Sequence, residues 1–348
     1  MKKFNYLFSI IALAIAMVMV SCSKVDDPVK PEEQSNIKDG MELGDCLEYL
    51  DVQNGVFTLN LPAGVSLVCN SEIEMGAPLI IAGQGDVPAT IKMSGEGRFI
   101  TLAGVGFENV IIDASELEAP LVTIGIADQA PEEWQFNGVS FDGVMVKGLK
   151  KALVASACKN YYGTINVENS TVEVGADVTV FDFTKGSVAL NFNVENSTFW
   201  APEATSKAFY SSQSGQKATE YSDAAVQIFE FTNSTFYNLT KGKNFFSHRQ
   251  SNQKWLEYNV TGNIFVNCGK SGQTIKGMNG GQGGANPTWN IKGNVFNFED
   301  ADTSADEVTG DDAEPVTESI AVVVKFADPA TGDFTQNDAK AGDPDWIK

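Results

Sequence analysis

The sequence predicts an all-β fold, a single-stranded right-handed parallel β-helix, from three observations. First, a short phrase recurs along the chain: a strand-like run, an Asn or Gly, a small or branched residue and an apolar anchor. Second, another strand-like phrase follows the first in several repeats. Third, apolar and polar residues alternate within the phrases, and no long 3.6-residue period runs through them. A repeat of about 30 residues that holds two or three short strands is one turn of a solenoid.

The anchors are expected to stack inside the coils, of which we expect at least seven. Successive anchors lie 29, 31, 27, 37, 29 and 31 residues apart, and they are Ile112, Phe141, Val172, Phe199, Phe236, Phe265 and Phe296. Asn just before an anchor suits a tight corner, because Asn tolerates left-handed backbone. A propeller blade needs about 40–45 residues for four strands, and a sandwich would not repeat its corner sequence.

The second phrase reads KALVAS at 151–156, KAFYSS at 207–212 and KNFFSH at 243–248, and the three copies align without gaps. Two strand phrases at a constant offset indicate coils rather than a series of hairpins. The first coils are assigned to 43–113 and the regular coils to 114–300. An acidic loop is expected over 301–315. The segment 316–348 is expected to hold a last strand, SIAVVVKF, and a C-terminal cap in which Trp346 covers the open end of the solenoid.

The N-terminus reads as an export signal over 1–21, with two lysines followed by an apolar run that is short for a spanning helix. The run ends in MVMVSC, which resembles a bacterial lipoprotein lipobox. That resemblance implies lipidation of Cys22; the alternative is an ordinary signal peptide with a chance cysteine. The polar segment 22–42 is expected to be a flexible tether.

Composition excludes several function classes. The net charge is −21, which argues against a nucleic-acid partner because phosphate binding needs a basic face. The chain has one histidine, His248, and two arginines, so a histidine metal site or a Ser-His-Asp triad has at most one place. The remaining cysteines show no metal-ligand spacing and favour buried single thiols, although export permits disulfides; they are Cys46, Cys69, Cys158 and Cys268.

The lipobox, the NSTF-type coils and the closing DPATGDF and AGDPDW motifs together resemble a group of exported Bacteroidetes lipoproteins of unknown function. The resemblance covers about residues 43–348 and implies a pectin-lyase-like β-helix in a polysaccharide-utilisation system. It also implies an outer-membrane protein, anchored by lipid through Cys22 and exposed at the cell surface. It supplies no established activity.

A basic stripe is the candidate binding site. Residues 241–254 carry four basic side chains and no acid, and we expect the stripe to bind a polysaccharide or oligosaccharide, with flanking aromatic rings stacked on sugars. The candidate ligand-binding residues are Lys243, His248, Arg249, Lys254, Tyr237 and Trp255. The alternative is that the lysines balance neighbouring acids and that the rings and His248 are structural.

The sequence therefore predicts a non-catalytic, surface-anchored glycan-binding or structural lipoprotein with no cofactor and no metal. The rival is a polysaccharide lyase acting on uronate-containing glycans, with Arg249 or Lys254 as the base and Ca²⁺ on carboxylates such as Glu203, Glu220 and Asp223. A hydrolase is disfavoured because Asp142 and Asp182 stand alone in their coils. Adhesion to a host protein is a third class.

Overall fold

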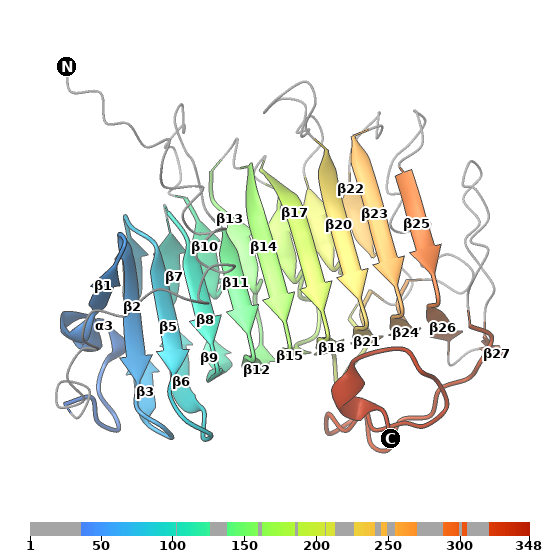
Figure 1. Cartoon of the computed structure of the whole chain (residues 1–348), viewed down its shortest axis with the longest axis horizontal. Helices are drawn as coiled ribbons and strands as arrows, with labels where there is room; N and C mark the ends of the chain where they lie inside the picture. Colours follow the sequence, from blue (N-terminus) through green and yellow to red (C-terminus); the bar gives the residue numbers. More distant parts are fainter. Residues whose placement is uncertain are drawn as a thin grey trace.

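The computed structural model describes most of the chain after residue 35. The described residues are 36–101, 103–125, 138–158, 162–184, 187–205, 207–212, 226–240, 245–248, 255–269, 288–298, 301–304 and 320–348. They form a parallel β-helix whose coils stack along the long axis of the molecule (Figure 1). Each complete coil contributes one strand to each of three sheets, so the strands pair between coils rather than within them. Within these residues, no helix is long and apolar enough to cross a membrane.

Sheet 1 forms the front of the molecule in Figure 1 and has ten strands among the described residues. All neighbours pair in parallel except β1 and β2. The strands are β1 (Asp51–Gln53), β2 (Val56–Leu61), β5 (Leu79–Gly83), β8 (Val105–Glu108), β11 (Val139–Asp142), β14 (Tyr162–Glu168), β17 (Val188–Glu195), β20 (Gln227–Thr232), β23 (Leu256–Thr261) and β25 (Thr288–Lys292).

Sheet 2 forms the lower face in Figure 1, and the described residues contribute ten strands to it as well. Its last pair, β26 and β27, is antiparallel, so part of the expected acidic loop is a strand. The strands are β3 (Ser66–Cys69), β6 (Ala89–Gly95), β9 (Val110–Leu117), β12 (Met145–Leu149), β15 (Thr171–Val174), β18 (Thr198–Trp200), β21 (Thr235–Tyr237), β24 (Ile264–Val266), β26 (Val295–Phe298) and β27 (Ala301–Ser304).

Sheet 3 has seven strands in the described part of the chain and lies behind sheet 1. It contains β4 (Glu72–Met75), β7 (Arg98–Thr101), β10 (Val122–Ile124), β13 (Val154–Ser156), β16 (Phe181–Phe183), β19 (Tyr210–Ser212) and β22 (Phe246–His248). The three copies of the second sequence phrase end in β13, β19 and β22, which confirms their common place in the coil. In the described part of the chain, seven coils, from β2 to β22, have a strand in all three sheets, and at least seven coils were expected.

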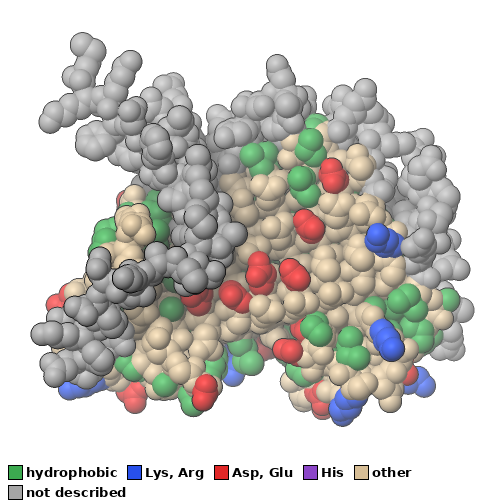
Figure 2. Space-filling model, in the orientation of Figure 1, with side chains coloured by type: hydrophobic (Ala, Val, Ile, Leu, Met, Phe, Trp, Pro, Cys, Tyr) green, Lys and Arg blue, Asp and Glu red, His purple; other side chains and the backbone are tan. Residues whose placement is uncertain are grey.

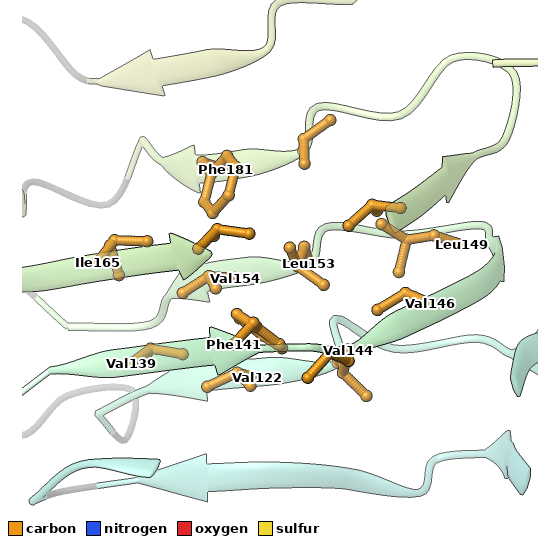
Figure 3. Close-up of a cluster of buried hydrophobic side chains, with 14 of the residues drawn as sticks. Val122, Val139, Phe141, Val144, Val146, Leu149, Leu153, Val154, Ile165 and Phe181 are labelled. Carbon is orange, nitrogen blue, oxygen red and sulfur yellow. The ribbon is translucent and has the colours of Figure 1, made fainter. Parts of the chain in front are cut away.

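The interior is a continuous apolar core built from the inward row of each strand. Figure 3 shows side chains from three sheets pointing into one interior, among them Val122, Val139, Val146 and Phe181. In sheet 2 the anchors stack in register, and Phe199, Phe236, Phe265 and Phe296 are all buried. The rings of Phe236 and Phe265 lie 4.9 Å apart and nearly parallel. The anchor prediction is confirmed for these residues.

Phe141 is the exception among the predicted anchors. It is buried, but it belongs to sheet 1, where it pairs with Phe107 and Val167. The sheet 2 anchor of this coil is Val146, which pairs with Ile112 and Val172. The repeat contains two glycines that could mark the corner, and the corner lies at the second one, Gly143. Every anchor of sheet 2 follows its corner residue by three positions.

The corner between sheets 1 and 2 explains why Asn and Gly recur in the sequence. The backbone there is left-handed in seven coils, with φ between 46° and 68°, at Asn109, Gly143, Asn169, Asn196, Asn233, Gly262 and Gly293. Asn and Gly tolerate this conformation better than other residues. The expectation that Asn marks a tight corner is therefore confirmed.

In the later coils, a ladder of buried polar side chains stabilises the residue after the corner. The Ser197 hydroxyl donates to the Glu195 carbonyl and accepts from the Ser170 amide of the preceding coil. Ser234 repeats this pattern for Ser197, and Asn263 and Asn294 continue it in the next two coils. These bonds satisfy backbone groups that would otherwise be buried without a partner.

The N-terminal end is closed by a short cap rather than by the first coil. Helix α3 (Leu43–Cys46) and the 3₁₀ helix η2 (Leu47–Tyr49) precede β1, and Leu43 and Cys46 are completely buried. Val68 of the first strand of sheet 2 bonds to the Met41 carbonyl, so this segment occupies the edge of the sheet. The region 43–49 was expected to belong to the opening coils, and it instead shields their end.

The C-terminal segment, 320–348, lies against the outer face of sheet 2 beside β18, β21, β24 and β26 (Figure 1). Residues 320–326 form no strand, which differs from the expected last strand. Phe334 contacts Trp200 and Tyr237, and Trp346 of the 3₁₀ helix η4 (Pro344–Trp346) donates to Thr198. The segment therefore covers a side of the solenoid, because that side carries outward-facing apolar side chains on its last coils.

Candidate functional site

Most of the predicted basic stripe lies outside the described residues. Lys243, Arg249 and Lys254 belong to this group, as does the predicted lipidation site Cys22. His248 ends β22 and pairs with Ser212 of the preceding coil. In the two preceding coils, the residues at this register position are Ser212 and Phe183. Both are buried, so this position faces the interior in those two coils. The stripe as a binding site stays a prediction.

The two aromatic candidates of the stripe lie against other parts of the protein. Trp255 is only 5% exposed and belongs to the main core. Tyr237 is half-buried on the outer face of sheet 2, where its ring contacts Phe326 and Phe334. Both rings therefore have packing roles in this structure.

The outer face of sheet 1 is the longest array of polar side chains among the described strands. Alternation along each strand sends every second residue outward, and the parallel register stacks these residues from coil to coil. The central outward row contains Ser140, Asn166, Asn193, Glu230, Asn259 and Asn290, each half-buried or exposed. Neighbouring members lie about 4.8 Å apart, the usual spacing between paired strands.

An acidic ladder runs beside the central row, at the end of each strand. Glu108, Asp142, Glu168 and Glu195 pair directly in register on four successive coils. Figure 2 shows acidic side chains crossing the front of the molecule, over sheet 1. In the later coils the same row continues as Thr232, Thr261 and Lys292.

Amide side chains moderate the repulsion within the ladder. Asn169 donates to Asp142 at 2.9 Å, and Asn166 donates to the Glu168 carboxylate. Asn259 makes a similar bond to Glu257 at 3.0 Å. Glu and Asn side chains therefore form short hydrogen-bonded groups that fix the orientation of the outer surface.

The electrostatics of the face are strongly negative. Within the described residues, the strands of sheet 1 contain a single basic side chain, Lys292. Desolvation first and the charge of Asp142 second raise the pKa of Glu108 above its ordinary value, although much of this side chain stays exposed. Such a face disfavours anionic ligands unless cations are supplied from elsewhere.

Sequence reasoning missed this ladder, although a signal for it is present. In four successive repeats an acid directly precedes the corner residue, in the dipeptides Glu108-Asn109, Asp142-Gly143, Glu168-Asn169 and Glu195-Asn196. From the sequence, Asp142 was expected to be a lone aspartate in its coil, and within the described residues this is correct. It gains carboxylate neighbours only through the register between coils.

The described residues hold no group of three or more His, Cys, Asp or Glu side chains arranged to bind a metal ion. Cys46, Cys69, Cys158 and Cys268 are free and buried, as favoured by the sequence. Burial is the main cause that raises the pKa of Cys46 to about 11 and that of Cys69 to about 12, which makes both thiols poor nucleophiles.

The fold and this face define the class of the protein: a parallel β-helix with a long polar, acidic side. No protein-family model matches the chain, and no curated protein matches it either.

Proposed function

We propose that this protein is a non-catalytic, glycan-associated lipoprotein that binds a polysaccharide along the outer face of sheet 1. In this proposal Cys22 carries the lipid that anchors the protein in the outer membrane, and the part of the expected tether before residue 36 holds the solenoid away from the lipid surface. The rest of the expected tether is not a free spacer, because Asp39, Gly40 and Met41 are hydrogen-bonded to β3. The biological context is polysaccharide utilisation at the cell surface.

The observation that carries the proposal is the central outward row of sheet 1. Its amide, hydroxyl and carboxylate groups supply both donors and acceptors, which is what a polyhydroxylated chain requires. The row extends over six coils, so a linear ligand can contact several side chains at once. Solenoids commonly use such extended surfaces for binding.

The charge of the face selects the class of glycan. Four stacked carboxylates lie next to the central row, and the sheet has one basic residue in its described strands. A uronate-rich polymer would be repelled there, whereas a neutral polysaccharide would meet hydrogen-bonding groups without a charge penalty. We therefore propose a neutral glycan for this face.

The test is affinity electrophoresis of the folded protein in gels that contain neutral or uronate-rich polysaccharides. The variant is Asn193→Ala with Glu230→Ala, two register partners in the middle of the row. Each lost hydrogen-bonding side chain is worth about 0.5–1.5 kcal/mol, so the double variant should lose at least about fivefold in affinity. Lys147→Ala, an exposed change on sheet 2, is the matched control and should bind as wild type does.

The proposal fails if no neutral polysaccharide slows the migration of the folded wild-type protein. It also fails if the double variant binds as well as wild type does. The gels that contain uronate-rich polysaccharide test the basic stripe instead, with Arg249→Ala and Lys254→Ala as the variants. Uronate binding that needs these two residues would move the site to the stripe. Release of unsaturated sugars from a uronate polymer would favour the polysaccharide lyase alternative.

A further inference from the structure

The C-terminal segment is attached to sheet 2 around a buried carboxyl group. Asp343 is 4% exposed and lies between the segment and strands β18 and β21. The Thr198 hydroxyl donates to Asp343 Oδ2 at 2.7 Å, and the Asp345 amide donates to Asp343 Oδ1 at 3.1 Å. The Trp346 indole donates to the same Thr198 hydroxyl at 2.9 Å, so the carboxyl, the hydroxyl and the indole form one network.

Among the described residues packed against this carboxyl group, none carries a positive charge that would balance it. Strands β18, β21 and β24 contain no Asp, Glu, Lys, Arg or His within their bounds. The charged neighbour within the segment is Asp345, whose like charge opposes ionisation of Asp343. Burying an unpaired carboxylate is costly, and such a group lowers the cost by holding its proton.

We propose that residues 320–348 form a pH-sensitive latch on sheet 2, held most tightly in acidic solution, with Asp343 as its titrating group. Opening of the latch uncovers Trp200 and Tyr237, which are register neighbours and pack against Phe334. The device is independent of where a glycan binds, because sheet 1 is a different side of the solenoid.

The direction of the effect follows from proton linkage. Desolvation is the main cause that raises the pKa of Asp343 to about 6 in the docked state, against an ordinary value of 3.8. Docking is therefore strongest below pH 4, where Asp343 is protonated in both states. Docking weakens as the pH rises to about 6, because Asp343 releases its proton at a lower pH in the undocked segment than in the docked one. A shift of about two pKa units corresponds to roughly a 100-fold change in the docking equilibrium.

The experiment is hydrogen–deuterium exchange of the full chain at several pH values from 4 to 7.5, with rates corrected for the intrinsic effect of pH. Amides of the segment that are bonded to the solenoid, such as Gly342 to the corner residue Gly262 and Asp343 to β21, should lose up to about 100-fold in protection as the pH rises. Amides of β5 and β8 should keep their protection, which shows that the solenoid stays folded.

Asp343→Asn is the deciding variant because it keeps the shape and removes the titration. Its segment should have protection that does not change with pH, whereas Asp345→Asn should keep most of the pH dependence. Wild-type protection that is flat from pH 4 to 7.5 overturns the proposal even if Asp343→Asn fails to fold. An equal pH dependence in folded Asp343→Asn also overturns it.

Discussion

Replacing Phe236 with Ala tests the stacked aromatic interior. Phe236 is completely buried, and its ring stacks on Phe199 at 5.9 Å and on Phe265 at 4.9 Å. Edge-to-face contacts with Phe209 and Phe245 close the remaining sides. The substitution therefore removes one step of a ladder that continues through neighbouring coils.

The expected cost is large because a rigid, fully packed site cannot collapse around the cavity. Phe→Ala changes in cores cost about 3–5 kcal/mol, and the loss of several ring contacts places this site near the upper end of that range. The assay is equilibrium unfolding in guanidinium chloride, followed by two optical probes whose transitions must coincide. The control is Val52→Ala, at a side chain that is 54% exposed, with an expected change within about 0.5 kcal/mol. A loss below about 1 kcal/mol for Phe236→Ala would refute the packing argument.

Two further predictions concern the corners and the acidic ladder. Asn196 has φ of 46°, so Asn196→Ala should lower the free energy of unfolding by about 1–2 kcal/mol while Asn196→Gly should have little effect; equal losses would contradict the role assigned to left-handed backbone. The pKa of Glu108 is raised in the folded state, so ionisation of this side chain opposes folding. The protonated side chain stabilises the fold below its unfolded pKa, and this stabilisation is lost as the pH rises through the folded pKa. Glu108→Gln should therefore raise the melting temperature at pH 7, more at low than at high salt, and should change little at pH 3; a lower melting temperature at pH 7 would count against repulsion in the ladder.

Local signals in the sequence were sufficient to predict the solenoid. The strand phrases recur at a nearly constant interval, and residues such as Asn196 and Asn233 mark corners whose backbone only a few residue types adopt. Phe141 shows the limit of this approach. Two Asn or Gly corners were available in one repeat, and only the pairing of Val146 with Val172 distinguishes the real corner.

The candidate site depends on information that a single repeat does not contain. Glu168 and Glu195 belong to different coils, and their contact arises from the pairing of β14 with β17. The place of the C-terminal segment is also non-local, since Asp343 bonds to a residue 145 positions earlier in the chain. A cap for the open end was the simpler expectation from the sequence. The outward-facing Trp200 and Tyr237 instead provide an apolar surface on sheet 2 that the segment covers.

Carboxylate footprinting with a neutral polysaccharide bound tests the central claim most directly. A carbodiimide labels exposed carboxylates, and mass spectrometry compares the labelling of each acid with and without the ligand. We predict that the bound glycan protects Glu195 and Glu230 on sheet 1 and leaves Glu173 on sheet 2 labelled as before. Binding that leaves Glu195 and Glu230 as reactive as in the free protein would contradict the assignment of this face.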